Sequence, residues 1–143
     1  MKRSVIILLL FCVFTLNAQT ISKKNRDAIM AMLAFQEKCW NAGSIEGYMS
    51  EYWNSDSLKF ISKDGVTKGW QTTLDRYEEH YPGKDAMGKL IFSEISLLGM
   101  NRKTIIVIGK WKLIKPDGSA GGRFTLICKK IRSKWKIVVD HTS

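Results

Sequence analysis

Four long β-strands are predicted over residues 89–142, and this part of the chain constrains the fold more than any other. The segments 89–99, 104–115, 121–131 and 134–142 are rich in Ile, Val, Leu and aromatic residues. The connections between them are two to five residues long, which is too short for a crossover helix. We therefore expect consecutive strands to be antiparallel neighbours in one sheet.

Two helices are predicted near the start of the domain. Apolar residues recur at helical spacing over residues 23–42, and Gly43 follows where a left-handed helix end is favourable. Ser44 is a suitable N-cap for a short second helix in the segment SIEGYMSEYW. The second helix would present Tyr48 and Tyr52 on one side.

A hairpin and a third helix are predicted between these helices and the long strands. Within residues 58–69, the pair Asp64-Gly65 favours a two-residue turn. Residues 70–81 follow a helical pattern that Pro82 stops. The order helix, helix, hairpin, helix, meander describes an α+β domain, in which a curved antiparallel sheet wraps around three helices.

The first eighteen residues have the pattern of a secretory signal peptide. Two charged residues are followed by an unbroken apolar run over residues 5–14 and by a short polar stretch that ends at Ala18. The run is too short for a stable transmembrane anchor. We therefore expect an exported protein, periplasmic or secreted and not inserted in a membrane after cleavage, whose single domain spans residues 19–143.

The excess positive charge of the chain, +10 in all, lies in its last third. Residues 19–100 contain ten Lys or Arg and eleven Asp or Glu. Residues 101–143 contain eleven Lys or Arg and only two Asp or Glu. This distribution fits lysines that coat a solvated sheet face, and an anionic partner is the alternative. Nucleic acid is not an expected partner, because export removes the chain from it.

The cysteines and histidines do not form a recognisable metal or cofactor motif. Cys39 and Cys128 can be bridged, or they can remain two buried thiols, and their spacing does not decide between these. His80 and His141 are not at the spacing of a helical ligand pair. Because a glycine-rich strand-to-helix loop is also missing from the sequence, we expect neither a metal nor another cofactor.

Seven separate segments of the sequence form a recognisable set. They are CWNAGSIEGYMSEYW, DGVTKGW, LDRYEEHYP, MGKLIFSEI, GKWKL, GGRFTLICKK and WKIVVDHTS. Together they resemble the nuclear transport factor 2-like superfamily and, more narrowly, its bacterial SnoaL-like branch, close to the association domain of calcium/calmodulin-dependent kinase II. The resemblance implies a cone-shaped fold with a pocket between the concave sheet face and the helices, and a dimer through the outer face.

The resemblance also directs attention to carboxylates, because isomerases of this fold pair a carboxylate base with an acid-donating group. Glu94 and Asp140 are the candidate bases here, and His141 or Tyr52 is the candidate acid. The tyrosine expected early in the first helix of a steroid isomerase is missing, since Gln36 and Trp40 occupy that helix face.

Period-two alternation predicts the orientation of the last strand. Trp135, Ile137, Val139 and His141 should share one face of the sheet, and Asp140 should lie on the other. If Trp135 points inward, His141 also points inward, toward Trp40. Asp140 would then hold the strand end by hydrogen bonds.

The function favoured by the sequence is binding of a small, largely apolar molecule that carries a polar group. An enzyme of the SnoaL or isomerase type and a dimerisation or interaction module are the alternatives. Whichever function holds, we expect a homodimer through the outer sheet face, with Ile106, Ile108 and Ile114 buried and Lys110 and Lys112 at a polar rim. A buried titratable residue in a roomy cavity would favour the enzyme, and a filled cone would favour the module. The candidate ligand-binding residues are Trp40, Tyr52, Trp53, Tyr77, His141 and Arg123, whose guanidinium can hold a carboxylate.

Overall fold

The computed structural model describes residues 20–143, so the expected signal peptide, residues 1–18, lies outside the described residues. In the described part, no helix is both long enough and apolar enough to cross a bilayer. The helices are α1 (Lys23–Asn41), α2 (Ile45–Met49), α3 (Trp70–His80) and α4 (Lys84–Met87). The strands are β1 (Lys59–Ser62), β2 (Gly65–Lys68), β3 (Lys89–Asn101), β4 (Thr104–Lys115), β5 (Gly118–Ile131) and β6 (Lys134–Thr142).

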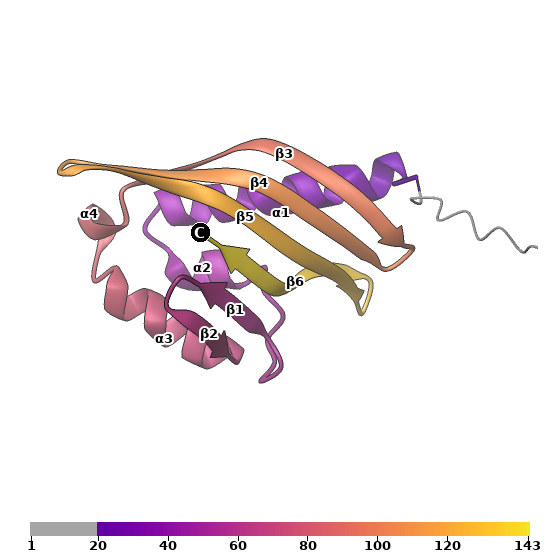
Figure 1. The fold of residues 1–143 in the computed structure, drawn as a ribbon, viewed down its shortest axis with the longest axis horizontal. Coiled ribbons are helices and arrows are strands. Elements are labelled where there is room, and N and C mark those ends of the chain that lie inside the picture. Colours follow the sequence, from indigo (N-terminus) through magenta and orange to yellow (C-terminus); the bar gives the residue numbers. More distant parts are fainter. Residues whose placement is uncertain (1–19) are drawn as a thin grey trace, which may run out of the picture.

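The six strands form one curved sheet in the order β2-β1-β6-β5-β4-β3. Figure 1 shows α1 behind the long strands and α3 alongside the β1–β2 hairpin. The expected α+β fold, with helices packed against a curved sheet, is confirmed. The sheet is mixed, however, because β1 pairs with β6 in parallel. A parallel pair requires a long connection, and α3 together with the whole meander supplies it.

Gly43 and Ser44 set the end of α1 and the start of α2 as expected, while the N-cap of α1, Ser22, was not predicted. The Ser22 hydroxyl accepts a hydrogen bond from the Asn25 backbone N–H, and Gly43 has a φ of 82° just after α1. The Ser44 hydroxyl accepts from the Gly47 N–H and caps α2. The four-residue helix α4 was not predicted from the sequence.

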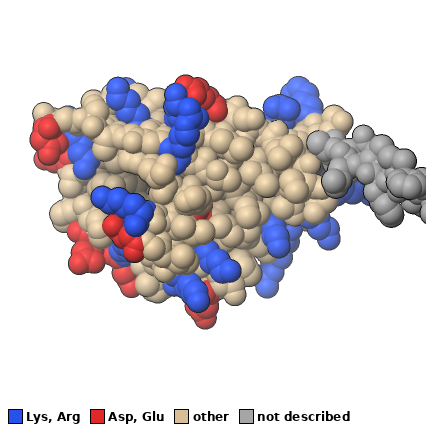
Figure 2. All heavy atoms as spheres, in the orientation of Figure 1, with Lys and Arg blue, Asp and Glu red and all other residues tan. Residues whose placement is uncertain are grey.

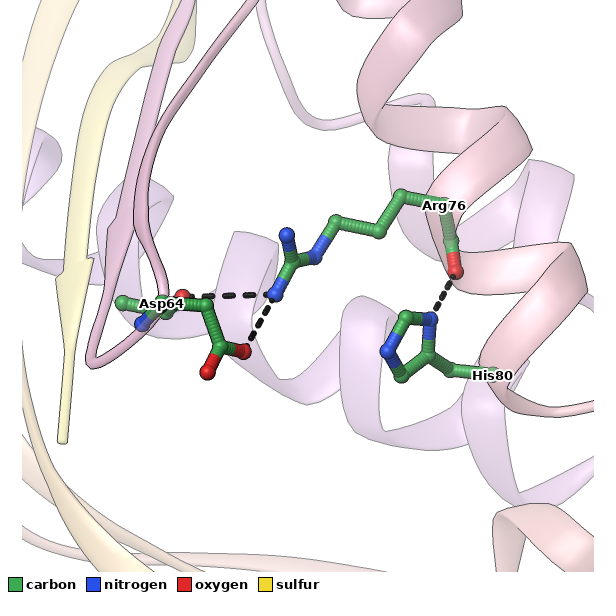
Figure 3. A network of polar contacts seen from close by, with 4 residues as sticks. Asp64, Arg76 and His80 are labelled. Carbon is green, nitrogen blue, oxygen red and sulfur yellow. Dashed lines mark hydrogen bonds and ion pairs between the residues drawn. The ribbon is translucent and has the colours of Figure 1, made fainter.

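The β1–β2 hairpin turns one residue earlier than expected. Ser62 pairs with Gly65, so Lys63 and Asp64 form the turn, and only Gly65 needs a positive φ, 115°. Arg76 of α3 donates to the Asp64 carboxylate over 2.8 Å, and His80 contacts the Arg76 carbonyl (Figure 3). These contacts attach the hairpin to α3.

Polar side chains of α1 protect the edge strand β3. The Asn41 side chain accepts from the Leu90 N–H at 2.7 Å and donates to the Leu90 carbonyl at 3.0 Å. One turn earlier on the helix, the Glu37 carboxylate accepts from the Phe92 N–H at 2.9 Å. The backbone groups of an exposed strand edge would otherwise be free to pair with another chain.

A β-bulge in β6 reverses the alternation of its side chains. Ile127 of β5 pairs with Val139, but Cys128 pairs with Ile137, so Val138 is an extra residue in β6. Before the bulge the inward residues are odd-numbered, and after it they are even-numbered. Asp140 is therefore buried on the concave side, whereas His141 is exposed.

Candidate functional site

A cavity of about 110 Å³ lies between the concave sheet face and the helices. Figure 2 shows a hollow in the surface near the α3–α4 connection and the end of β6. Nine of the fifteen lining residues are aromatic, so the walls are mainly apolar. The lining residues are Gln36, Trp40, Tyr48, Tyr52, Phe60, Tyr77, Tyr81, Leu90, Phe92, Trp111, Leu113, Phe124, Leu126, Asp140 and Thr142.

The charged group of the cavity is Asp140, whose residue is 4% exposed. The Tyr52 hydroxyl donates to Asp140 Oδ2 over 2.6 Å, and the Tyr48 and Tyr52 hydroxyl oxygens are 3.3 Å apart. The other carboxylate oxygen, Oδ1, is buried without any hydrogen-bond partner. Buried acceptors in proteins are nearly always satisfied, so an unpaired oxygen in a cavity wall marks a position for a ligand or water.

Two segments bring Tyr52 and Asp140 together. The Trp53 N–H donates to the Ile137 carbonyl at 2.8 Å, and the Ile137 N–H donates to the Glu51 carbonyl at 3.1 Å. The chain just after α2 is thereby fixed beside β6, next to the bulge. The bulge turns Asp140 inward, where the Tyr52 hydroxyl reaches it.

Burial sets the protonation of these groups. It raises the pKa of the Asp140 carboxyl from 3.8 to about 7, and the hydrogen bond from Tyr52 opposes part of this rise. Burial also raises the pKa values of Tyr48, Tyr52 and Tyr77 above the ordinary value of 10. The tyrosines remain neutral hydrogen-bond donors at every physiological pH, while Asp140 changes its charge near neutrality.

An aromatic cluster forms the helical wall. Trp40 is fixed by a hydrogen bond from its Nε1 to the Met87 carbonyl, 3.1 Å long. Its ring meets those of Tyr48 and Tyr81 edge-on, with centroids 5.1 and 4.9 Å away. Gln36 donates to the Tyr48 carbonyl at 3.3 Å, which holds the end of α2 against α1.

Three of the predicted site residues lie outside the cavity on the opposite sheet face. His141 is exposed because of the bulge in β6, so the expected approach to Trp40 was wrong. Glu94 has a φ of 51° in a second bulge, in β3, and pairs with Lys110 and, at 3.9 Å, with Arg123. The hydrogen bond from Lys110 lowers the pKa of Glu94. Arg123 is exposed too.

Of the other predicted site residues, all but one line the cavity. Trp40, Tyr52, Tyr77 and Asp140 line the cavity, whereas Trp53 does not. The prediction missed Trp111, although alternation with its neighbours Lys110 and Lys112 could have placed it inward. Tyr81, which follows α3, had no such signal.

The described residues decide whether the cysteines are bridged. Cys39 and Cys128 are free thiols, so they are not bridged. Over residues 20–143, no group of three or more His, Cys, Asp or Glu is arranged to hold a metal ion. The titratable side chains that line the cavity are the Asp140 carboxyl group and the phenols of Tyr48, Tyr52, Tyr77 and Tyr81.

Known structures place this arrangement in a family. A nuclear transport factor 2-like protein of unknown function from Shewanella oneidensis MR-1 is 35% identical, with a TM-score of 0.80 over 82% of this chain and 98% of that chain. A putative calcium/calmodulin-dependent protein kinase II association domain from Xanthomonas campestris is similar in fold at 13% identity, with a TM-score of 0.64 over 90% of this chain and 91% of that chain.

A protein of unknown function with a cystatin-like fold from Nostoc punctiforme also has the same fold, with a TM-score of 0.71 at 13% identity over 87% of this chain and 93% of that chain. No protein-family model matches the sequence, and no curated protein matches it. The finer assignment to the SnoaL-like branch stays a prediction. On its identity to the Shewanella protein over nearly the whole of that chain, this protein belongs to the nuclear transport factor 2-like superfamily.

Proposed function

We propose that the protein binds a small, largely apolar molecule in the cavity, with the polar group of that molecule at Asp140. The observation that carries this proposal is the unpaired Oδ1 of Asp140, a residue that lines a mainly apolar cavity. A buried polar atom without a partner costs about 1–3 kcal/mol. A ligand that places a polar group there recovers this cost, and the aromatic rings around it supply apolar contact.

The dimensions of the cavity support a ligand of modest size. Its volume of about 110 Å³ is somewhat less than the roughly 150 Å³ of an engineered apolar cavity that binds benzene in another protein. Tyr77, Tyr81, Phe92, Trp111 and Thr142 are partly exposed and line the mouth, while Asp140 lies deep inside. A larger molecule would insert one end and leave the rest at the mouth.

A second candidate function is proton-transfer catalysis on such a molecule. It is favoured by the pKa of about 7 for Asp140, which leaves the carboxyl able to accept or release a proton at neutral pH. Tyr52, held neutral by burial, would orient the carboxyl and stabilise its charge. Asp140 is thus the candidate base in this alternative, and Glu94 and His141 are not in position for the role.

The binding proposal predicts that a metabolite library contains compounds that raise the melting temperature of the wild type. A ligand at a hundred times its Kd adds about 2.7 kcal/mol, or roughly 5–10 °C for a domain of this size. Leu126→Phe, which places a larger side chain in the cavity, should abolish the shift. Leu98→Phe is the matched control, because Leu98 is 44% exposed on β3, and it should keep the shift.

Two results would decide against binding in this cavity. One is a library without a stabilising compound, and the other is an equal shift in wild type and Leu126→Phe. Turnover of a stabilising compound by the wild type, lost in Asp140→Asn, would select the catalytic alternative.

We also propose that this binding takes place outside the cytoplasm. The support is the charged and apolar segment at the start of the sequence. Protein recovered from its native host should have an intact mass that begins at Gln19. A mass that still includes Met1–Ala18 would remove the support for export.

A further inference from the structure

When Asp140 is ionised, its hydrogen bonds leave an acceptor, not a donor, for a ligand. Tyr52 donates to Oδ2, and the Tyr48 hydroxyl lies within hydrogen-bond distance of the Tyr52 oxygen. Both phenols can thus direct their donors toward the carboxylate. Because Oδ1 remains unpaired, a ligand group that donates a hydrogen bond fits this position better than a carbonyl or another carboxylate.

The charges around Asp140 favour a cation. The titratable groups that face it are Tyr48 and Tyr52 from the α2 region, Tyr77 from α3 and Cys128 from β5, all neutral when protonated. None of the fifteen residues that line the cavity within the described chain is Lys, Arg or His. Once ionised, Asp140 is therefore a buried negative charge without a cationic partner.

The walls of the cavity favour a cation as well. Aromatic faces attract ammonium groups, and nine aromatic side chains line the space. The chain already uses this attraction at the mouth, where Lys115 Nζ lies 5.3 Å from the ring centroid of Tyr81. That lysine does not line the cavity, so the deep position beside Asp140 is left for a cation from outside.

We infer that the polar group taken by the cavity is a protonated amine, so that the ligand is a small alkylammonium ion whose N–H donates to Asp140 Oδ1. This inference rests on the proposed binding function and names its ligand class. The hydrocarbon part lies against the aromatic walls, and the ammonium group pairs with the carboxylate. A quaternary ammonium ion has the charge without an N–H donor, so it should bind less tightly than a primary one.

The test compares how tightly the full described domain binds probes that share an isobutyl group. Binding is followed by NMR through the indole signal of Trp40. Isobutylammonium, isobutanol and isovalerate place a cation, a neutral alcohol and an anion on similar apolar groups. The ammonium ion should bind at least about tenfold more tightly than the alcohol, and isovalerate should bind most weakly. Tetramethylammonium should bind more weakly than isobutylammonium.

Two variants and the pH dependence assign the preference to Asp140. Asp140→Asn should reduce the ammonium-to-alcohol ratio to about one, whereas Glu94→Gln, which removes an exposed carboxylate on the opposite face, should leave the ratio unchanged. Because a proton competes for the carboxylate, ammonium affinity should fall as the pH drops below about 7, where the pKa of Asp140 lies. The affinity for isobutanol should not follow this profile.

The outcomes separate this inference from the proposed function. Equal binding of all three probes, or tightest binding of isovalerate, overturns the amine and leaves a cavity that binds other small molecules. An unchanged preference for isobutylammonium over isobutanol in Asp140→Asn overturns the carboxylate contact. If none of the probes perturbs Trp40, the cavity does not take small amines, while the library screen decides the proposed function independently.

Discussion

Asp140→Asn is expected to make the protein more stable above pH 7, by roughly 1–3 kcal/mol, although it removes a hydrogen-bonded side chain from the cavity. The reason is the raised pKa of Asp140, about 7 in the folded state against an ordinary value of 3.8. Between these two pH values the folded state binds a proton that the unfolded state has lost. The contribution of Asp140 to stability is therefore full below about pH 4 and falls as the pH rises to about 7.

The size of this loss follows from the pKa difference and amounts to roughly 4 kcal/mol above pH 7. Asparagine cannot ionise, so it avoids the loss. Its amide oxygen can still accept the hydrogen bond from Tyr52, but its amide N–H group would lack a partner, at a cost of about 1–3 kcal/mol. The gain at pH 8 is the difference between these terms, and at pH 4 the variant should be no more stable than the wild type.

Urea unfolding of both proteins from pH 4 to pH 8 measures the effect, since the other carboxyl groups are common to both and cancel in the difference. Glu94→Gln is the control of opposite sign, because the Lys110 hydrogen bond lowers the pKa of this exposed carboxylate. Its removal should cost stability at neutral pH and not at low pH. If Asp140→Asn is less stable than the wild type at pH 8, burial of the ionised Asp140 carboxylate does not destabilise the fold as expected.

Local sequence signals predicted most of the fold because local interactions determine those elements. Ser44 can cap only a helix that starts beside it, and Gly43 adopts the positive φ that a helix end requires. Long alternating segments with short connections leave few choices but an antiparallel meander. The parallel pairing of β1 with β6 could not be predicted in this way, since it joins segments about eighty residues apart.

The errors in the site come from β-bulges. An alternation of period two assumes a regular strand, and Val138 breaks it in β6 without any unusual residue type to reveal the break. The bulge exchanges the positions of Asp140 and His141, so the predicted inward residue became the exposed one. In β3, alternation would place Glu94 on the same face as Leu90 and Phe92, but the bulge at Glu94 turns this residue to the opposite face.

The sequence also could not predict whether side chains fill the interior of the cone or leave a cavity. The residues that line the cavity are the same aromatic types that fill protein cores. Only their packing decides whether space remains between Trp40, Tyr48 and Tyr81 on one side and Leu126 on the other. Neither condition set from the sequence is met in full, because a buried titratable residue, Asp140, is present but the cavity is only about 110 Å³.

The homodimer expected through Ile106, Ile108 and Ile114 would use the outer face of the sheet, where Ile106 belongs to a longer apolar row. Leu98 of β3, Ile106 of β4, Ile127 of β5 and Val139 of β6 are consecutive neighbours in the strand register. Leu98 is 44% exposed, and Ile108, beside the row, is 42% exposed. Basic side chains at Lys110 and Lys112 border this region along β4. An apolar centre with a charged border is the composition of a protein interface.

We therefore expect Ile106→Lys to convert a dimer of this protein into a monomer, with dimer affinity reduced at least about a hundredfold. In an isologous pair the substitution is present twice near the centre, where a single central residue contributes about 2 kcal/mol or more, and the two ammonium groups would repel each other. Sedimentation or light scattering across micromolar concentrations measures the change.

The matched control is Val66→Lys, which replaces a 55% exposed β-branched residue in the hairpin, away from the row, and should leave the dimer intact. A wild type that is monomeric throughout this range, or an equal loss of association in both variants, would exclude the apolar row as the dimer interface.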